Sequence, residues 1–258
     1  MNQSPELSLV VPFYNEAEAA AALIDEIQRA LSGKLSYEII AVDDGSTDET
    51  VAVLQRLLQE KKCPLRLLLH AGNYGQSSAL HTGIRAARAA WVATLDGDGQ
   101  NDPADILTLL AARDRSMLPH LQLITGHRKK RRDHLVKIIS SRVANLVRGS
   151  ILRDQTPDTG CGLKLIHRKT YLALPFFDHM HRFLPALFQR EGGRVLHCPV
   201  NHRPRRAGRS KYGIADRLWV GIVDLMGVWW LRRRAMRADE RTSAARAISR
   251  STASRDGA

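Results

Sequence analysis

Two short acidic segments hold the residues of this chain that are best suited to chemistry. Asp96 and Asp98 stand two positions apart in Asp-Gly-Asp-Gly-Gln, directly after the strand-like segment 91–95. Asp43 and Asp44 follow another apolar segment in the same way. Mg²⁺ and Mn²⁺ prefer oxygen ligands and commonly bridge phosphates, so the first pair could hold such a metal. Asp and Gly also form turns and Asp caps helices, so a turn or a cap is the alternative for each segment.

The first half of the chain predicts the elements that would position these acids. Strand-like and helix-like patterns alternate, with strands expected at 7–14, 37–44, 65–70 and 91–96 and helices at 16–31, 51–60, 77–90 and 102–112. Such alternation favours right-handed βαβ units and a parallel sheet. Ligands of these sheets bind beyond the carboxyl ends of the strands. We therefore expect Asn15–Glu16, Asp43–Asp44 and Asp96–Asp98 to gather at one edge.

The second half is less regular. A basic and then amphipathic stretch at 127–148 is followed by a polar loop, a strand with a short helix at 163–175, and a helix at 181–193 ended by glycines. A strand near 195–205, a basic loop at 205–213 and an apolar segment at 218–234 complete the pattern. From residue 235 the chain has almost no large apolar side chains, which predicts a disordered polar tail over 235–258.

Composition restricts the classes of partner. The 258 residues carry 39 Lys and Arg against 26 Asp and Glu, a net charge of +13, which predicts nucleic acid, an anionic lipid surface or phosphorylated substrates. No P-loop motif occurs, and the three cysteines are too widely spaced for a disulfide framework or a CxxC site. We see neither a signal peptide nor an apolar run long enough to span a bilayer.

An ordered series of motifs resembles a known family. The segments are VVPFYNE, VDDGSTDET, NYGQSSALHTGI, LDGDGQNDP, TGHR, DTGCGLK, HRFLPAL and HRPRRAGRSKYG. Together they resemble glycosyltransferase family 2 and, within it, the dolichyl-phosphate and undecaprenyl-phosphate sugar transferases. The resemblance covers roughly residues 7–234. It implies an α/β protein with the GT-A nucleotide-sugar transferase fold, as a single domain over residues 1–234.

The resemblance also implies roles for matching residues. A nucleotide-sugar pocket would comprise Pro12, Tyr14, Asn15, Glu16, Asp43, Asp44, Gln76 and Asp96. Mg²⁺ or Mn²⁺ would be held by Asp96, Asp98 and Gln100. Acceptor phosphate would meet Arg128, His181, Arg182, Arg205, Ser210 and Lys211. The residues expected to act in catalysis are Asp98, Asp158, Arg128, Arg205 and Lys211, with a turn residue as the alternative for Asp158.

These residue types suit one reaction. When the bond between a sugar and a diphosphate breaks, negative charge grows on the leaving nucleotide, and a metal with nearby Arg or Lys stabilises it. A phosphate acceptor is already anionic and needs positioning rather than a strong base. We therefore expect in-line transfer from a UDP- or GDP-sugar to a polyprenyl phosphate, with inversion and no covalent intermediate.

Two amphipathic segments, about 135–150 and 214–234, predict contact with an anionic membrane surface. The second is flanked by arginines and contains Trp219, Trp229 and Trp230, residues that favour lipid headgroups and the water–lipid boundary. A buried core helix with Asp224 satisfied internally is the alternative. We expect a peripheral enzyme at the cytoplasmic face of the inner (plasma) membrane. The sequence leaves open whether it is a homo-oligomer.

Two other functions compete with this interpretation. The same fold could transfer sugar to a saccharide or protein hydroxyl, which would need a general base. A basic nucleic-acid-binding protein would explain the charge, but aromatic residues make up only 5% and no groove-reading or stacking motif is visible. The acidic strand ends also argue against nucleic acid, which we do not expect as a partner.

Overall fold

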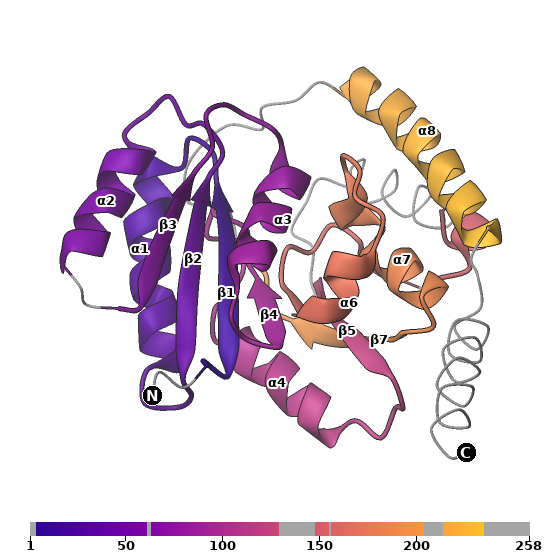
Figure 1. Cartoon of the computed structure of the whole chain (residues 1–258), viewed down its shortest axis with the longest axis horizontal. Coiled ribbons are helices and arrows are strands. Elements are labelled where there is room, and N and C mark those ends of the chain that lie inside the picture. The colour runs from indigo at the N-terminus through magenta and orange to yellow at the C-terminus, as the bar shows by residue number, and fades with distance from the viewer. Residues whose placement is uncertain (1–3, 61–62, 129–147, 155, 204–213, 235–258) are drawn as a thin grey trace, which may run out of the picture.

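A single seven-stranded sheet organises the protein. The computed structural model describes residues 4–60, 63–128, 148–154, 156–203 and 214–234, and for 214–220 it describes the backbone alone. The strands are β1 (Leu7–Phe13), β2 (Tyr37–Asp43), β3 (Leu65–Leu69), β4 (Trp91–Thr94), β5 (Leu121–Arg128), β6 (Lys164–His167) and β7 (Arg194–Val200). Their order is β3-β2-β1-β4-β6-β5-β7 (Figure 1). β6 runs antiparallel to β4 and β5, and the other neighbours are parallel.

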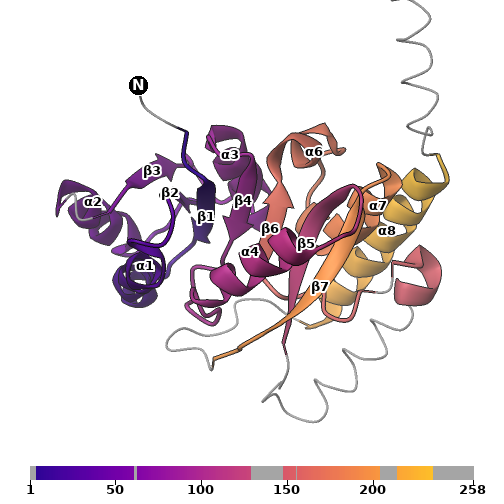
Figure 2. The same ribbon diagram turned by 90° about the horizontal axis from the view of Figure 1, so that it is seen from below.

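Helices cover both faces of the sheet because the strands are apolar on both sides, as in other α/β folds. Leu9 and Val11 of β1 belong to a core with α1 (Ala17–Leu31), α2 (Thr50–Glu60) and α4 (Asp105–Arg115). Val10 lies in a second core with α3 (Gln76–Ala86), α6 (Arg168–Ala173), the 3₁₀ turn η1 (Met180–Arg182), α7 (Leu184–Arg190) and α8 (Ile214–Arg233). The result is a three-layer α/β/α arrangement, seen from two sides in Figures 1 and 2.

The predicted alternation of strands and helices over the first half is confirmed, with small differences where elements begin and end. The helix expected at 77–90 ends at Ala86. At the start of α2, the Asp48 carboxylate accepts the backbone N–H of Thr50 at 3.0 Å. In the second half, β5 was not predicted, and the helix expected at 181–193 is divided into η1 and α7.

Helix α8 packs against α7 through one face and exposes apolar side chains on the other. Val228 is 1% exposed, and Arg190 Nε of α7 donates to the carbonyl of Leu231 at 3.0 Å. Asp224 faces the protein, where its carboxylate contacts His179 Nδ1 at 3.1 Å. Asp224 is therefore satisfied internally and an outer apolar face remains exposed, and contact of that face with a membrane surface stays a prediction. Within the described residues, no helix has the length and apolar character needed to cross a membrane.

Candidate active site

The carboxyl ends of β1, β2 and β4 meet at one edge, as the sequence predicts. Backbone hydrogen bonds join the strand ends: the N–H of Asp44 donates to the carbonyl of Phe13 at 2.8 Å, and the N–H of His70 donates to that of Asp43 at 2.9 Å. β4 pairs with the other side of β1. The loops that follow the strands therefore lie side by side and carry the acidic segments together.

Asn15 ties the loop after β1 to the loop after β2. Its side-chain Oδ1 accepts the N–H of Thr47 at 2.7 Å, and its own N–H donates to Ser46 Oγ at 2.9 Å. The N–H of Glu16 donates to Thr50 Oγ1 at 2.9 Å, which locks the start of α1 to the start of α2. Asn15 has a φ of 53°, a left-handed conformation that Asn adopts more readily than most residues. Asn15 and Glu16 thus shape the edge where a nucleotide is expected.

The two acids at the end of β2 differ in their partners. Asp44 is 3% exposed, and its oxygens are within hydrogen-bond distance of His70 Nδ1 (2.7 Å), Tyr74 N (3.0 Å) and Gly75 N (2.8 Å). Asp43 accepts the N–H of Ser46 at its Oδ2, but its buried Oδ1 has no hydrogen-bond partner among the described residues. Asp44 therefore fixes the loop after β3, and Asp43 offers the acceptor atom that a ligand could use.

Glycine allows these loops to approach. Gly45 has a φ of +72°, and a Cβ there would lie 2.4 Å from the carbonyl carbon of Gly72. A Cβ on Gly162 would lie 2.1 Å from Asp96 Oδ2, so the loop of the DTGCGLK motif lies directly against that carboxylate. Larger residues at these two positions would push apart the loops that form the site.

Asp96 and Asp98 lie together on the loop after β4. Gln76 Nε2, at the start of α3, donates to Asp96 Oδ1 at 2.7 Å, and the N–H of Gln100 donates to Asp98 Oδ1 at 3.1 Å. Burial, followed by the charge of Asp98, raises the pKa of Asp96 to about 6 although nearby cations act in the opposite direction. Two repelling carboxylates in a partly dehydrated site favour a bound cation.

Two cations face this acid pair from the other half of the sheet. Lys164 at the start of β6 is 6% exposed, and its ammonium group donates to the carbonyl of Cys161. Arg128 at the end of β5 forms a two-pronged ion pair with Asp158, with Nε–Oδ2 at 2.7 Å and Nη2–Oδ1 at 2.9 Å. The charges of both Lys164 and Arg128 act on Asp96. The site thus sets cations beside acids, as a diphosphate with a metal would require.

Asp158 and Cys161, both in the DTGCGLK motif, are buried. Asp158 is 6% exposed and holds Arg128 in place, and its Oδ1 also accepts the N–H of Gly160 at 3.1 Å, as a turn residue would. A direct catalytic role for Asp158 stays a prediction. Burial raises the pKa of the Cys161 thiol, and the residue is 1% exposed. A neutral, packed thiol is a poor nucleophile.

His181 and Arg182 lie on η1, close to the start of α3. His181 Nδ1 is 2.7 Å from Ser77 Oγ, next in sequence to Gln76. Burial and the neighbouring Lys164 and Arg182 lower the pKa of His181 well below its usual value, so the ring is neutral near pH 7. His181 could therefore meet a phosphate only as a neutral hydrogen-bonding group. Arg182 is half-buried beside it.

Arg203 fixes the point from which the basic loop departs. Its guanidinium pairs with Glu26 at 2.6 Å and with Asp102 at 2.9 Å, and its N–H donates to the carbonyl of Gln100 at 3.0 Å. The chain therefore leaves β7 next to the Asp-Gly-Asp-Gly-Gln motif. Arg205, Ser210 and Lys211 lie outside the described residues, as does most of the predicted 135–150 segment.

The donor set at Asp96, Asp98 and Gln100 fits a metal brought in with a phosphate ligand. Among the residues that the structure describes, no three His, Cys, Asp or Glu side chains come together as a metal cage. Mg²⁺ in phosphate-transfer sites is commonly bound by one or two carboxylates plus substrate phosphates. Two carboxylates and the Gln100 amide oxygen match that mode, and the raised pKa of Asp96 agrees with it. Pro12 and Tyr14 are half-buried at the end of β1 beside this loop.

Sequence reasoning missed two buried residues of the site. Lys164 belongs to the DTGCGLK motif but had no assigned role. Asn101 is 3% exposed, and its Oδ1 accepts the N–H of Asp96 at 3.3 Å. Lys164 could have been found from its place at the start of an apolar strand, because a buried lysine needs a charged or polar partner. Asn101 reads in sequence as an ordinary turn residue.

Comparison with solved structures identifies the fold. The fold resembles that of glucosyl-3-phosphoglycerate synthase from Mycobacterium tuberculosis, solved with Mn²⁺, UDP and glucosyl-3-phosphoglycerate, with a TM-score of 0.67, 18% identity and coverage of 88% of this chain and 80% of that one. A mannosyltransferase from Pyrobaculum calidifontis, solved with GDP-Man and Mn²⁺, gives a TM-score of 0.59 and 22% identity, covering 81% of this chain and 59% of that one. The fold is therefore the GT-A fold of glycosyltransferases.

The particular family follows from sequence. Residues 8–172 match the model of glycosyl transferase family 2, and the chain belongs to that family. It is 37% identical to dodecaprenyl-phosphate galacturonate synthase of Rhizobium johnstonii, over 90% of this chain and 68% of the relative. It is 32% identical to undecaprenyl-phosphate 4-deoxy-4-formamido-L-arabinose transferase of an Enterobacter species, over 86% and 65%. The chain thus spans about two thirds of the length of these relatives.

Proposed function

We propose that this glycosyltransferase moves a sugar from a UDP- or GDP-sugar to a polyprenyl phosphate, with Mg²⁺ or Mn²⁺ and with inversion, at the cytoplasmic face of the inner membrane. The names of the relatives, which specify polyprenyl phosphates, support the acceptor. Structural neighbours solved with UDP or GDP-Man and Mn²⁺ support the donor class and the metal.

The observation that carries the proposal is the meeting of acids and cations at one sheet edge. Asp96 and Asp98 would hold the metal, with the Gln100 amide as a further ligand, and the bound ion would offset charge on the donor diphosphate. Arg128 is fixed by Asp158 and needs no reorganisation to act on a phosphate. Lys164 is buried next to the acid pair and adds a second positive charge to the site.

The reaction follows from these groups without a proton donor or acceptor. An anionic oxygen of the acceptor phosphate attacks the anomeric carbon, a new carbon–oxygen bond forms, and the bond to the nucleoside diphosphate breaks. The electron pair leaves with the diphosphate, next to Arg128 and Lys164. A single displacement of this kind inverts the anomeric carbon.

The contacts of Asp158 favour a phosphate acceptor over a hydroxyl. A hydroxyl acceptor needs a general base, whose lone pair must be available to take a proton. Asp158 uses both oxygens on Arg128, and Oδ1 also accepts the N–H of Gly160 at 3.1 Å. Asp44 is occupied in the same manner. These buried acids are therefore better suited to holding the site together than to deprotonating an alcohol.

The outer face of α8 supports placement at a lipid surface. Ile222, Val223, Met226, Trp229 and Trp230 are between 41% and 65% exposed, and their spacing puts them on one side of the helix. A helix that is apolar outward as well as inward fits the boundary between water and lipid. Arg233 and Arg234 lie over the rings of Trp229 and Trp230, at 4.8 and 5.9 Å from the ring centroids.

The test is transfer to lipid by the purified chain. The protein is incubated with undecaprenyl phosphate in detergent, a panel of radiolabelled UDP- and GDP-sugars, and Mn²⁺ or Mg²⁺ or EDTA. The Asp98→Asn variant is compared with Asp114→Asn, which removes the same charge from an exposed position at the end of α4. We expect label in the lipid phase that EDTA and Asp98→Asn abolish and Asp114→Asn leaves unchanged.

Each failure points to a different error. Label on added saccharide or peptide, with none on lipid, would overturn the acceptor and favour a hydroxyl. Transfer that continues in EDTA would overturn the metal. A product that keeps the donor's anomeric configuration would overturn the single displacement.

A further inference from the structure

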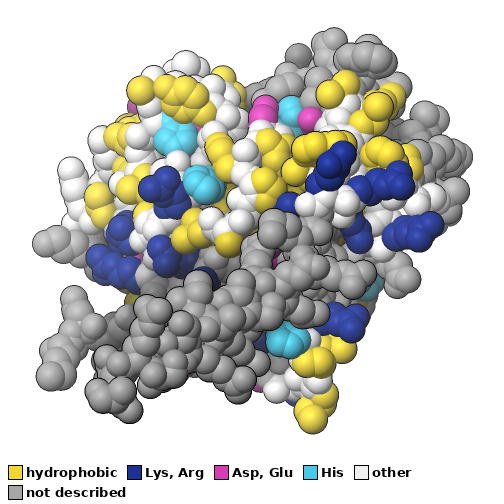
Figure 3. Space-filling model, turned by 45° about the vertical axis from the view of Figure 1, so that its right-hand side comes forward, with side chains coloured by type: hydrophobic (Ala, Val, Ile, Leu, Met, Phe, Trp, Pro, Cys, Tyr) yellow, Lys and Arg dark blue, Asp and Glu magenta, His cyan; other side chains and the backbone are white. Residues whose placement is uncertain are grey.

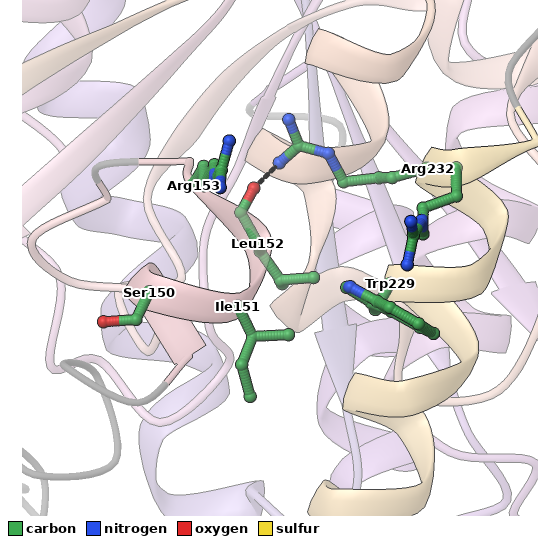
Figure 4. Close-up of a pocket in the computed structure, with 7 residues that line it drawn as sticks. Ser150, Ile151, Leu152, Arg153, Trp229 and Arg232 are labelled. Carbon is green, nitrogen blue, oxygen red and sulfur yellow. Dashed lines mark hydrogen bonds between the residues drawn. The ribbon is translucent and has the colours of Figure 1, made fainter.

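A pocket of about 490 Å³ lies at the C-terminal end of α8, where the helix meets the short helical segment 148–152. One wall is the segment 150–153, and the other is Trp229, Arg232 and Arg233 (Figure 4). Asp224 contacts His179, the residue before η1. Arg233 lies nine residues further along α8, or about 14 Å away. The pocket is therefore built by a different part of the fold from the acidic strand ends.

The lining of this pocket is positively charged. It contains the guanidinium groups of Arg153, Arg232 and Arg233, and no carboxylate occurs among its seven described residues. The nearest acid in sequence, Asp154, is fully buried and paired with Arg148. Arg232 donates to the carbonyl of Leu152, which joins the two walls, and Arg233 lies over the Trp229 ring. An anion is the ligand that such a pocket would stabilise.

The rim of the pocket is apolar. Ile151 and Trp229 are each 41% exposed, and Trp230 and Met226 on the same side of α8 are 55% and 65% exposed. Figure 3 shows basic side chains gathered beside hydrophobic ones on this side of the molecule. A ligand that satisfies both parts must have an anionic head and an apolar body. Free phosphate lacks the second feature.

We propose that this pocket binds the phosphodiester headgroup of an anionic membrane phospholipid, at a site separate from the polyprenyl-phosphate acceptor. The headgroup would lie against Arg153 and Arg233, and the acyl chains would run along Trp229, Trp230 and Met226. This inference rests on the membrane location in the proposed function and not on sugar transfer. It gives the enzyme an anchor that holds α8 at one depth and orientation in the bilayer surface.

The experiment measures binding of the full chain to vesicles. Extruded vesicles of phosphatidylcholine alone, or of phosphatidylcholine and phosphatidylglycerol at a ratio of about 3:1, are sedimented with wild type and two double variants. Arg153→Gln with Arg233→Gln removes charge from the pocket. Arg115→Gln with Arg194→Gln removes the same charge from exposed positions on other elements and serves as the matched control. Unfolding midpoints and nucleotide binding of each variant serve as controls for folding.

We expect the pocket variant to bind the anionic vesicles at least about tenfold more weakly than wild type, and the control variant to stay within about threefold. Equal losses in the two variants would overturn the pocket, because binding would then follow net charge alone. Equally strong binding of the wild type to vesicles of phosphatidylcholine alone would also overturn it, because binding would then not depend on an anionic headgroup.

A second measurement uses no arginine variant. Phosphatidylglycerol brominated on its acyl chains should quench the tryptophan fluorescence of the wild type, and Trp229→Phe should lose a clear share of that quenching. Quenching that Trp229→Phe leaves unchanged would contradict the proposed seating. Vesicle binding and transfer to detergent-solubilised acceptor are measured separately, so a protein that binds lipid without transferring sugar would refute the proposed function and leave this inference standing.

Discussion

The two ends of β2 carry buried acids with opposite consequences. Glu38 near its start is 5% exposed, and its oxygens accept from Ser8 Oγ at 2.7 Å, the N–H of Arg88 at 2.8 Å and Arg66 Nη1 at 2.9 Å. Asp43 at its end keeps a buried oxygen for which the described residues offer no donor. The carboxylate near the start of the strand has donors for both of its oxygens, and the one at the end keeps an acceptor atom that a ligand could use.

A related difference in pKa separates Glu38 from Asp96, which follows β4 at the same sheet edge as Asp43. Burial alone would raise the pKa of Glu38, but the hydrogen bonds from Ser8, Arg88 and Arg66 outweigh burial and lower it. At the other edge of the sheet, burial and the charge of Asp98 raise the pKa of Asp96 to about 6. A buried carboxylate whose charge is stabilised by fixed donors is structural. One whose charge is disfavoured indicates a site for a cation or a substrate.

The largest expected effect is the loss of transfer when one metal-binding acid is neutralised. Asp96→Asn should lower kcat/KM by about a thousandfold or more, because the charge on the leaving diphosphate would lose its principal counter-ion. Its unfolding midpoint without metal should be equal to or higher than that of wild type, because one of two repelling charges is gone. Assays of transfer and thermal unfolding on the same preparation provide the check. A lowered midpoint would show that Asp96 is structural, like Glu38.

A smaller loss is expected from Lys164→Met, about a hundredfold in kcat/KM. Lys164 contributes a fixed charge from the buried floor of the site, and methionine preserves most of its volume. The loss should fall on kcat more than on KM if the charge acts on the leaving group. Lys164→Arg is the matched variant and should recover part of the rate. An equal loss in both variants would indicate that packing, and not charge, is what matters at this position.

Glu38, near the start of β2 and away from the site edge, should give the reverse result: a loss of stability without a loss of transfer. Glu38→Gln should cost about 2 kcal/mol of folding stability, because Arg66 and the N–H of Arg88 would lose a charged acceptor. Transfer activity at low temperature should stay within about twofold of wild type. Urea unfolding monitored by circular dichroism measures the first quantity. Reduced activity in a fully folded Glu38→Gln variant would show that Glu38 is not purely structural and would contradict its separation from the acids of the site.

The sequence was sufficient for the parts of the site that lie next to one another along the chain. Periodicity predicted β1, β2, β4 and the edge where their acids meet, because strand ends of a parallel sheet share one direction. Periodicity could not indicate that both oxygens of Asp44 would form hydrogen bonds with His70 and with two backbone N–H groups of the next loop. Asp43 and Asp44 are the same residue type in sequence, and only tertiary contacts separate them.

The second half of the chain was less predictable for physical reasons. β5 is followed by residues that are basic rather than turn-forming, and its pattern Leu-Gln-Leu-Ile-Thr-Gly-His-Arg has few β-branched residues. The ion pair between Arg128 and Asp158 joins residues 30 positions apart, so no local pattern signals it. The buried position of Lys164 depends equally on β6 lying antiparallel between β4 and β5.

The smallest expected effect separates the two ends by pH. Because the pKa of Glu38 is lowered in the folded protein, its contribution to stability is present above its unfolded value near 4.5 and is lost as pH falls through the folded value. The stability gap between wild type and Glu38→Gln should therefore be full at pH 7 and should narrow below pH 4.5. Urea unfolding at pH 7, 5 and 4 measures the gap. A stability gap that is constant across this range would mean that the charge of Glu38 contributes nothing and that only its shape matters. The electrostatic contrast between Glu38 and the acids of the site would then be lost.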